Sequence, residues 1–174
     1  MYRLIPVVFL LLTACGSQPS PAPTVPRTAS PTASAAADVC HQGSTIFCVQ
    51  NPAVTQDTIG STICQRGWTK TVRPDIKFTN DLKRQQLALY ADRHPNDPNW
   101  TVAGTEEDHR LPLELGGAPR DPMNLSPEEG PSPNPKDRDE SGFKQLVCAH
   151  KLALVAAQVQ FIAKWLAPYP EYKQ

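Results

Sequence analysis

The sequence has no excess of charge of either sign, because 17 basic residues balance 17 acidic ones. Proteins that hold polyphosphate by charge alone usually present a basic face, so tight and non-specific binding of nucleic acid is not expected. Hydrolysis of a phosphate ester remains compatible with this balance, since that reaction needs only local positive charge and a metal ion.

The apolar run at the start of the chain is too short to cross a bilayer as a mature helix. Residues 4–12 are apolar and follow a single basic residue, Arg3, which predicts a signal peptide over residues 1–14. Leu12-Thr13-Ala14-Cys15 resembles a bacterial lipobox, whose cysteine becomes the lipidated first residue after cleavage. We therefore expect a protein anchored to a membrane of the cell envelope through Cys15, on its extracytoplasmic side. A soluble secreted protein, with its signal cut nearby, is the alternative.

Large apolar residues are almost missing from the segment after Cys15. Residues 16–37 consist almost wholly of Ser, Pro, Thr, Ala and Gly, with Val25 as the only large apolar residue and Arg27 as the only charged one. Such a composition cannot form a core, and its prolines favour an extended chain. We expect residues 15–37 to be the lipidated cysteine and a disordered tether. Residues 38–174 show no internal repeat and have the length of one domain.

Paired C-x-x-C motifs are also missing, which disfavours a structural zinc site. Apart from Cys15, an even number of cysteines remains in a domain expected to be exported, where disulfides persist. Four cysteines allow three pairings. We favour Cys40–Cys48, because the two are close in sequence, and Cys64–Cys148, because that bridge would join the beginning of the domain to its last helical region.

A segment in the middle of the domain combines a histidine with the pattern of a β-hairpin. Asp108 and His109 end one predicted strand, and a second strand is predicted over residues 111–115, where leucine alternates with other residues. Gly116 and Gly117 then suit a turn that any Cβ atom would crowd. The sequence therefore predicts a histidine held on a rigid hairpin.

His109 has the chemistry of a general base. A neutral imidazole, whose ordinary pKa is about 6.5, can take a proton from water near neutral pH. Asp108 faces elsewhere on the strand, so its carboxylate can serve as the first metal ligand while the imidazole serves water. The competing interpretation is a solvated acidic turn over residues 106–108 beside an ordinary surface histidine. The glycine pair and Asn124 downstream favour the reactive site.

This order of parts, with a charged run over residues 136–140 after Asn124, resembles the HNH endonuclease superfamily and its ββα-metal site. Residues 51–165 look like a group of exported bacterial HNH-like domains. The motifs are Val54-Thr55-Gln56, Ser61-Thr62-Ile63-Cys64, Val72-Arg73-Pro74, Glu107-Asp108-His109, Val147-Cys148 and Ala157-Gln158. The resemblance implies an α+β fold, in which a small hairpin-plus-helix site lies within a disulfide-linked domain of helices and short strands. It also implies metal-dependent hydrolysis of phosphodiester bonds.

Asn124 corresponds, by resemblance, to the middle residue of the HNH name. In the family that residue fixes the hairpin loop and the orientation of the histidine by hydrogen bonding. A plain turn asparagine after Pro122 is the competing interpretation. The third family position departs from the pattern, because no histidine lies between Asn124 and His150.

A helix starting near residue 136 would place several side chains on one stripe, at about 100° per residue. The stripe holds Lys136, Glu140, Phe143, Val147 and His150. Glu140 is our expected second metal ligand, with Asn134 and Asp137 as alternatives. Lys136 is predicted to meet a phosphate oxygen, and a plain helix pair with Glu140 is the alternative.

Three arginines are further candidates for phosphate contacts, or else surface charges: Arg73, Arg110 and Arg120. The oxygen-rich ligand set suits one Mg²⁺ or Mn²⁺ ion better than Zn²⁺. We expect a monomer that cuts nucleic acid, DNA ahead of RNA, and no inhibitor or envelope partner can be named from the chain. The alternative function is a non-catalytic envelope lipoprotein that uses a degenerate HNH-like scaffold to bind a protein or the cell wall.

The flanking segments carry weaker patterns. Residues 67–72 are predicted as a short strand ended by Pro74. A helix is predicted from Thr79 or Asn80 to about residue 91, with Leu82, Leu89 and Tyr90 or Gln86 near one face. Residues 94–99 are predicted as a loop. A helix break is expected at residues 149–151, where His150 closes the first helix. The apolar stripe of a last helix is then expected at Leu154, Ala157 or Gln158, Phe161, Ile162 and Trp165, packed in the core.

Overall fold

The computed structural model describes residues 38–130 and 133–168. The predictions for residues 1–37, namely the signal peptide, the lipidated Cys15 and the tether, lie outside the described residues. In the described part, the chain forms no helix that is long and apolar enough to cross a membrane. Residues from 38 onward belong to one compact unit.

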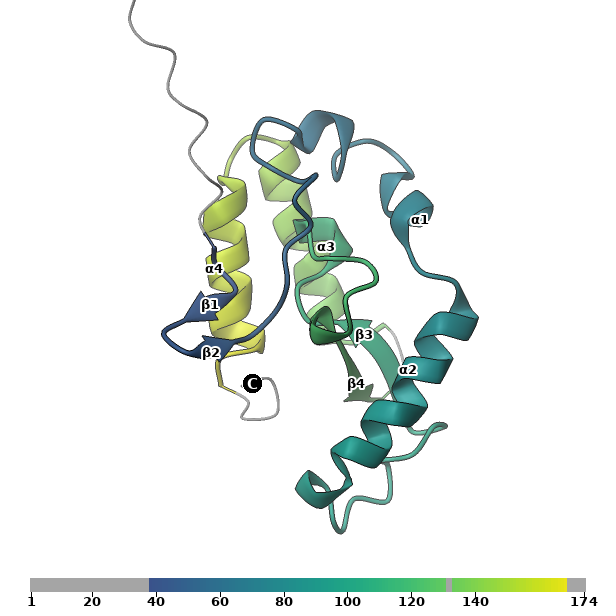
Figure 1. Ribbon diagram of the computed structural model, residues 1–174. Coiled ribbons are helices and arrows are strands. Elements are labelled where there is room, and N and C mark those ends of the chain that lie inside the picture. Colours follow the sequence, from purple (N-terminus) through teal and green to yellow (C-terminus); the bar gives the residue numbers. More distant parts are fainter. Residues whose placement is uncertain (1–37, 131–132, 169–174) are drawn as a thin grey trace, which may run out of the picture. The chain divides into compact units, whose positions relative to one another are not determined.

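Helices and short antiparallel strands together make up the described part of the chain, which confirms the α+β class (Figure 1). The helices are α1 (Trp68–Val72), α2 (Ile76–Leu89), α3 (Pro135–Cys148) and α4 (Leu154–Trp165). The strands form two pairs: β1 (His41–Gln42) with β2 (Thr45–Ile46), and β3 (Thr105–His109) with β4 (Leu125–Glu129). Single 3-10 turns cover Ile59–Ser61, Ala91–Arg93, Leu113–Leu115 and Pro122–Asn124.

The main hairpin differs from its prediction in its second strand. β3 ends at His109 as expected, but its partner is β4, with His109 opposite Leu125 and Thr105 opposite Glu129. Leu113–Leu115 is a 3-10 turn, and the three leucines of residues 111–115 are all buried. The prediction of a strand there was wrong, because the segment folds on itself: the amide of Gly117 donates to the carbonyl oxygen of Pro112 at 2.9 Å.

Two further boundaries differ from the sequence-based expectation. Residues 68–72 form helix α1 and not a strand, since the amide of Arg73 donates to the Thr69 carbonyl within the segment. Helix α2 begins at Ile76, before the expected Thr79 or Asn80, because Asp75 caps it by accepting from the amide of Phe78 at 2.9 Å. Leu89 is 73% exposed, so the expected apolar face was also wrong there.

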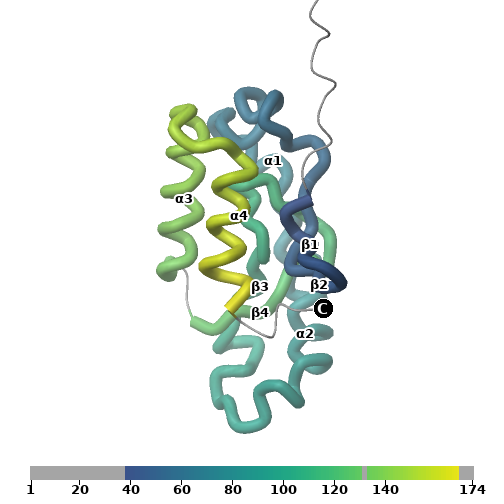
Figure 2. The backbone as a smooth tube through the Cα atoms, turned by 90° about the vertical axis from the view of Figure 1, so that its left-hand side faces the viewer, coloured from purple at the N-terminus to yellow at the C-terminus, as the bar shows by residue number. Residues whose placement is uncertain are grey.

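The last two helices follow their predictions closely. α3 and α4 lie side by side in both views (Figure 1, Figure 2), and Phe143 meets Phe161 edge to face at 6.3 Å between ring centroids. The break between them falls at residues 149–153, where His150 takes the left-handed conformation with φ 55° and its amide donates to the carbonyl of Val147. The predicted stripe of α4 is buried at Leu154, Ala157, Gln158, Phe161 and Ile162, and Trp165 is partly buried against the core.

Both predicted disulfides are confirmed. Cys40 is bonded to Cys48 with an S–S distance of 2.06 Å, and Cys64 is bonded to Cys148, which lies 84 residues further along the chain. The second bridge joins the turn after Ile59–Ser61 to the last residue of α3, as expected. It closes a long loop and so constrains the unfolded chain more than the first bridge does.

Candidate active site

The two residues predicted to carry the chemistry point in different directions from the end of β3. Asp108 accepts a hydrogen bond from Nζ of Lys136 on α3 at 2.7 Å, so its carboxylate faces that helix. His109 instead places Nε2 at 3.1 Å from the carbonyl oxygen of Pro119. This is the alternation that a strand imposes on successive side chains. By the same rule Glu106, two residues before Asp108, also faces α3, and Asn134 Nδ2 donates to its Oε1 at 3.2 Å.

Lys136 places a buried ammonium among the acidic groups. Its Nζ lies 2.7 Å from Asp108 Oδ2, 2.6 Å from Glu128 Oε1 and 3.1 Å from the carbonyl oxygen of His109. Glu140 Oε1 is farther away, at 3.8 Å. Because Lys136 is only 4% exposed and its three N–H bonds all meet oxygen acceptors, it serves the interior of the domain. The sequence predicted that Lys136 contacts a phosphate oxygen, whereas in the structure its ammonium forms ion pairs with Asp108 and Glu128.

The carboxylates around Lys136 do not share one protonation state. Burial acts to raise the pKa of Asp108, but the charge and the hydrogen bond of Lys136 outweigh it, and the pKa lies below its ordinary value. Burial first, and then the negative charge of Asp108, raise the pKa of Glu140 to about 9. At neutral pH, Asp108 is thus ionised and Glu140 is protonated. As a metal ligand, Glu140 would first have to lose that proton.

The imidazole of His109 is held in a neutral form with one basic nitrogen. Burial lowers the pKa of His109, and the nearby positive charge of Arg73 acts in the same direction. A carbonyl oxygen can only accept a hydrogen bond, so the contact with Pro119 places the proton on Nε2 and leaves the lone pair on Nδ1. This is the protonation state that a general base needs, although the residue is only 4% exposed.

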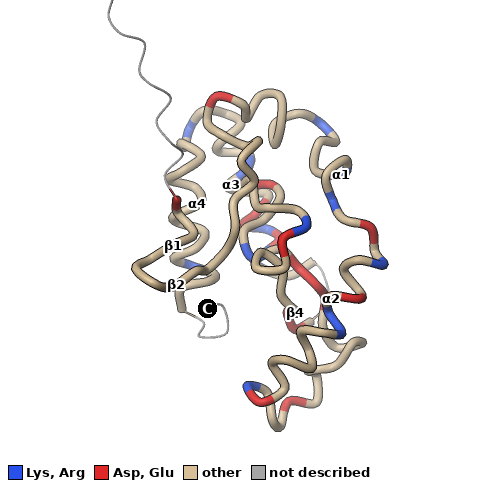
Figure 3. The backbone as a smooth tube through the Cα atoms, viewed as in Figure 1, with Lys and Arg blue, Asp and Glu red and all other residues tan. Residues whose placement is uncertain are grey.

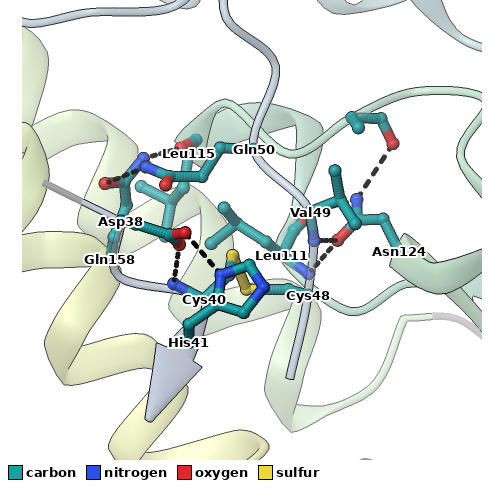
Figure 4. The surroundings of a disulfide bond; sticks show 11 residues. Asp38, Cys40, His41, Cys48, Val49, Gln50, Leu111, Leu115, Asn124 and Gln158 are labelled. Atoms are coloured by element: carbon teal, nitrogen blue, oxygen red, sulfur yellow. Dashed lines mark hydrogen bonds and ion pairs between the residues drawn. A yellow bond between two sulfur atoms is a disulfide. The ribbon is translucent and has the colours of Figure 1, made fainter. Parts of the chain in front are cut away.

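Asn124 is fully buried and ties together the loop that follows His109 (Figure 4). Its Oδ1 accepts from the amides of Leu111 at 3.0 Å and Val49 at 3.3 Å, and its Nδ2 donates to the carbonyls of Leu111 and Ala118. A Cβ atom on Gly117 would lie 1.7 Å from the Leu111 carbonyl oxygen, which explains the glycine there. These bonds are those of a positioning residue, since Ala118 directly precedes the Pro119 that holds His109.

The start of α3 accounts for Asn134 and Asp137. Asn134 Oδ1 accepts from the amides of Lys136 and Asp137, and Asp137 Oδ2 accepts from the amide of Asn134, which together form a capping box. Both residues thus have a structural role that does not require a metal.

Three carboxylates, including that of Asp108, nevertheless lie close together where α3 meets β3. One carboxylate oxygen from each of Glu106, Asp108 and Asp137 lies within 4.8 Å of the others. Burial first, and then the charges of Asp108 and Asp137, raise the pKa of Glu106, so the neighbouring carboxylates contribute to the shift. A donor set made only of carboxylate oxygens fits Mg²⁺ or Mn²⁺. Glu106 was not singled out from the sequence, although the i, i+2 spacing to Asp108 on a strand would have indicated it.

The three candidate arginines lie in different surroundings. Arg73 is exposed and close enough to His109 for its charge to affect the imidazole. Arg110 is 1% exposed, so it is part of the interior. Arg120 pairs with Asp75 at 3.2 Å and lies over the ring of Phe78. Figure 3 shows that β3 itself carries a continuous acidic stretch, at residues 106–108. Of the three arginines, Arg73 has the surroundings that best suit a phosphate contact.

Comparison with known proteins identifies no relative of this chain. No protein-family model matches the chain, and neither a curated protein nor a solved structure matches it. The site therefore has to be interpreted from its own residues.

Proposed function

We propose that this protein is a metal-dependent hydrolase of nucleic-acid phosphodiester bonds, with DNA as the preferred substrate. The observation that supports it best is the group of Glu106, Asp108 and Asp137 where β3 meets α3, with a neutral His109 next to Asp108 at the end of β3. In this proposal the chain is held by a lipid on Cys15 to the outer side of a membrane, so the enzyme would meet nucleic acid outside the cytoplasm.

Each residue has a defined task in this proposal. Glu106, Asp108 and Asp137 would hold one divalent ion, which when bound supplies positive charge to the phosphate and to the leaving oxygen. His109 accepts a proton from water at Nδ1, while the Pro119 carbonyl keeps Nε2 protonated and the ring in place.

Lys136, Asn124 and Arg73 support these groups. Lys136 keeps Asp108 ionised, because its ammonium lowers the pKa of that carboxyl group. Asn124 holds the loop that carries Pro119. Arg73 contributes exposed positive charge near His109 that a phosphate can approach.

Cleavage assays test the proposal directly. The purified protein, with both disulfides formed, is incubated with plasmid DNA and with RNA in the presence of Mg²⁺, Mn²⁺ or Zn²⁺, and separately with a chelator. We expect metal-dependent cutting that falls by about 10²-fold or more in His109→Ala. His41→Ala is the matched control, because His41 is exposed on β1 and remote in sequence from the hairpin. The mechanism would be ruled out if wild type still cut in the presence of the chelator and His109→Ala cut as fast as wild type.

A second candidate function is supported by the contacts of Lys136. Because this ammonium already neutralises Asp108 and Glu128, the hairpin and α3 can be stable without a metal, as a non-catalytic envelope lipoprotein requires. In that case the fold would serve as a scaffold for a protein or cell-wall partner. Folded wild-type protein that cuts neither DNA nor RNA with any of the three metals, and whose melting temperature is the same with and without chelator, would favour this function.

A further inference from the structure

We propose a second metal site, for a divalent transition-metal ion such as Zn²⁺, formed by His94, Asp97 and Glu129. One ligand atom from each of these side chains lies within 4.8 Å of the other two. Glu129 ends β4 and pairs with Thr105, so the site lies at the opposite end of the hairpin from His109. It does not depend on the proposed hydrolytic function.

The histidine of this site is already fixed in position. The His94 ring stacks on Trp100, with ring centroids 3.6 Å apart and an interplanar angle of 6°. Trp100 is anchored in turn, because its Nε1 donates to the carbonyl oxygen of Leu87 at the end of α2. A ligand held by its surroundings loses little conformational entropy on binding, which favours metal affinity.

Asp97 is oriented by the loop in the same way. Its Oδ1 accepts from the amide of Asn99 at 2.8 Å, and its own amide donates to the carbonyl of His94 at 3.2 Å. The remaining oxygen, Oδ2, then lies 3.7 Å from His94 Nδ1. That separation is too long for a hydrogen bond. It is close to the spacing of about 3.3–3.6 Å between two ligands that each lie about 2.0–2.2 Å from one tetrahedral ion.

Glu129 completes the set from a different element. Its carboxyl group is hydrogen-bonded to that of Asp97, so two acidic groups from the loop and from β4 meet beside the imidazole. A divalent cation at this point would take the place of the proton that this hydrogen bond requires. The mixture of one nitrogen and two oxygen donors suits Zn²⁺ and its neighbours better than Mg²⁺, which prefers oxygen alone.

A cleft of about 290 Å³ adjoins the site and leaves space for a further ligand. His94, Trp100 and Glu129 line it, together with Glu128 and Lys136. Three protein ligands with an open fourth position are typical of zinc sites that exchange water or bind a small molecule. The cleft thus gives the ion access to solvent and to the buried polar groups around Lys136.

Titration of the purified full chain with Zn²⁺, followed through the imidazole ¹⁵N signals, tests this site, because the protein has only four histidines. We expect the His94 Nδ1 signal to change at equimolar zinc. Glu129→Gln and Asp97→Asn should each weaken the zinc affinity by about tenfold or more. Asp92→Asn, an exposed acidic residue in the preceding turn, is the matched control and should leave the affinity unchanged.

Three results would overturn the inference. One is a His94 signal that does not respond to equimolar zinc in folded wild-type protein. Another is a zinc response of the same affinity in wild type and in Glu129→Gln, whose substitution lies on the exposed end of β4 and leaves its backbone pairing in place. Zinc-dependent changes confined to His109 would likewise assign the ion to the acidic group at α3.

Discussion

At the scale of single residues, Lys136 determines the character of the polar interior. Its ammonium is the cation nearest to Asp108 and Glu128, with contacts of 2.7 and 2.6 Å. A buried ion pair stabilises little when compared with apolar residues of the same shape, but removing one partner leaves a buried charge without compensation. Loss of Lys136 should therefore destabilise the packing of the hairpin against α3.

Lys136→Met tests that expectation. We expect a loss of about 3–5 kcal/mol in the free energy of unfolding, because the positive charge that contacts the buried carboxylates of Asp108 and Glu128 would be lost. Chemical denaturation at neutral pH measures it. Lys144→Met, on the same helix but outside these ion pairs, should change the stability by about 0.5 kcal/mol or less. Equal losses in the two variants would contradict the role of Lys136.

The raised pKa of Glu140 predicts how the free energy of unfolding depends on pH. Its pKa is raised from 4.5 to about 9, mainly by burial, and its Oε1 makes no hydrogen bond. Between these pH values the unfolded chain loses the proton while the folded chain keeps it. This group therefore lowers stability as pH rises through that range, by at most about 1.4 kcal/mol per pH unit.

Glu140→Gln removes the titrating proton and keeps the shape of the side chain. The variant should match wild type near pH 4 and become progressively more stable than wild type from about pH 5 to 8. Chemical denaturation across this range provides the comparison. Asp139→Asn, the half-buried neighbour on α3 that pairs with Lys164, serves as control and should not show this trend. A difference between wild type and Glu140→Gln that stays constant with pH would refute the assignment.

At the scale of elements, local signals predicted some segments and failed for others. Helices α3 and α4 follow from the spacing of their apolar residues. The structure adds the capping box of α3, formed by Asn134 and Asp137, which had been predicted only as candidate metal ligands. The segment 111–115 alternates like a strand, yet its leucines all enter the core. Alternation indicates which residues are apolar, but it does not decide which partner strand is available. β4, the true partner, contains Pro127 and two glutamates, and it lacks a strand-like pattern.

The two disulfides should differ in their contribution to stability. Replacing Cys64 and Cys148 by alanine should cost about 4–5 kcal/mol, and replacing Cys40 and Cys48 about 2–3 kcal/mol. The difference arises because the bridges span 84 and 8 residues, so they restrict the unfolded chain to different degrees. Denaturation of both double variants under oxidising conditions compares them. A larger loss from Cys40 and Cys48 would show that native-state packing outweighs chain entropy.

At the scale of the whole molecule, a neutral total charge conceals an uneven distribution. β3 carries three acidic residues in succession (Figure 3). Of these, Glu106 accepts a hydrogen bond from Asn134, the N-cap of α3, and Asp108 accepts one from Lys136 on α3. An ion bound there would join two elements that are separated in the sequence. Its binding should therefore stabilise the entire domain and not only the hairpin.

Thermal unfolding with and without Mg²⁺ or Mn²⁺ measures this linkage. An ion present at 100 times its dissociation constant should add about 2.7 kcal/mol to the free energy of unfolding. Glu106→Gln should abolish most of that increment, because it removes a ligand charge without disturbing the capping box of α3. Glu114→Gln, an acidic residue in the 3-10 turn and outside the acidic group, is the control. An increment of equal size in wild type and Glu106→Gln would exclude this position for the ion.

The sequence by itself determined the features that depend on short-range chemistry. The pairing of four cysteines, the two closing helices with their break at residues 149–151, and the strand that ends in Asp108 and His109 all follow from spacing and residue type. Only the tertiary structure decided which groups meet. Lys136, Asp108 and Glu128 come from α3, β3 and β4, and their contacts depend on how these elements pack. Because desolvation and ion pairing act through space, such a cluster leaves no local pattern in the chain.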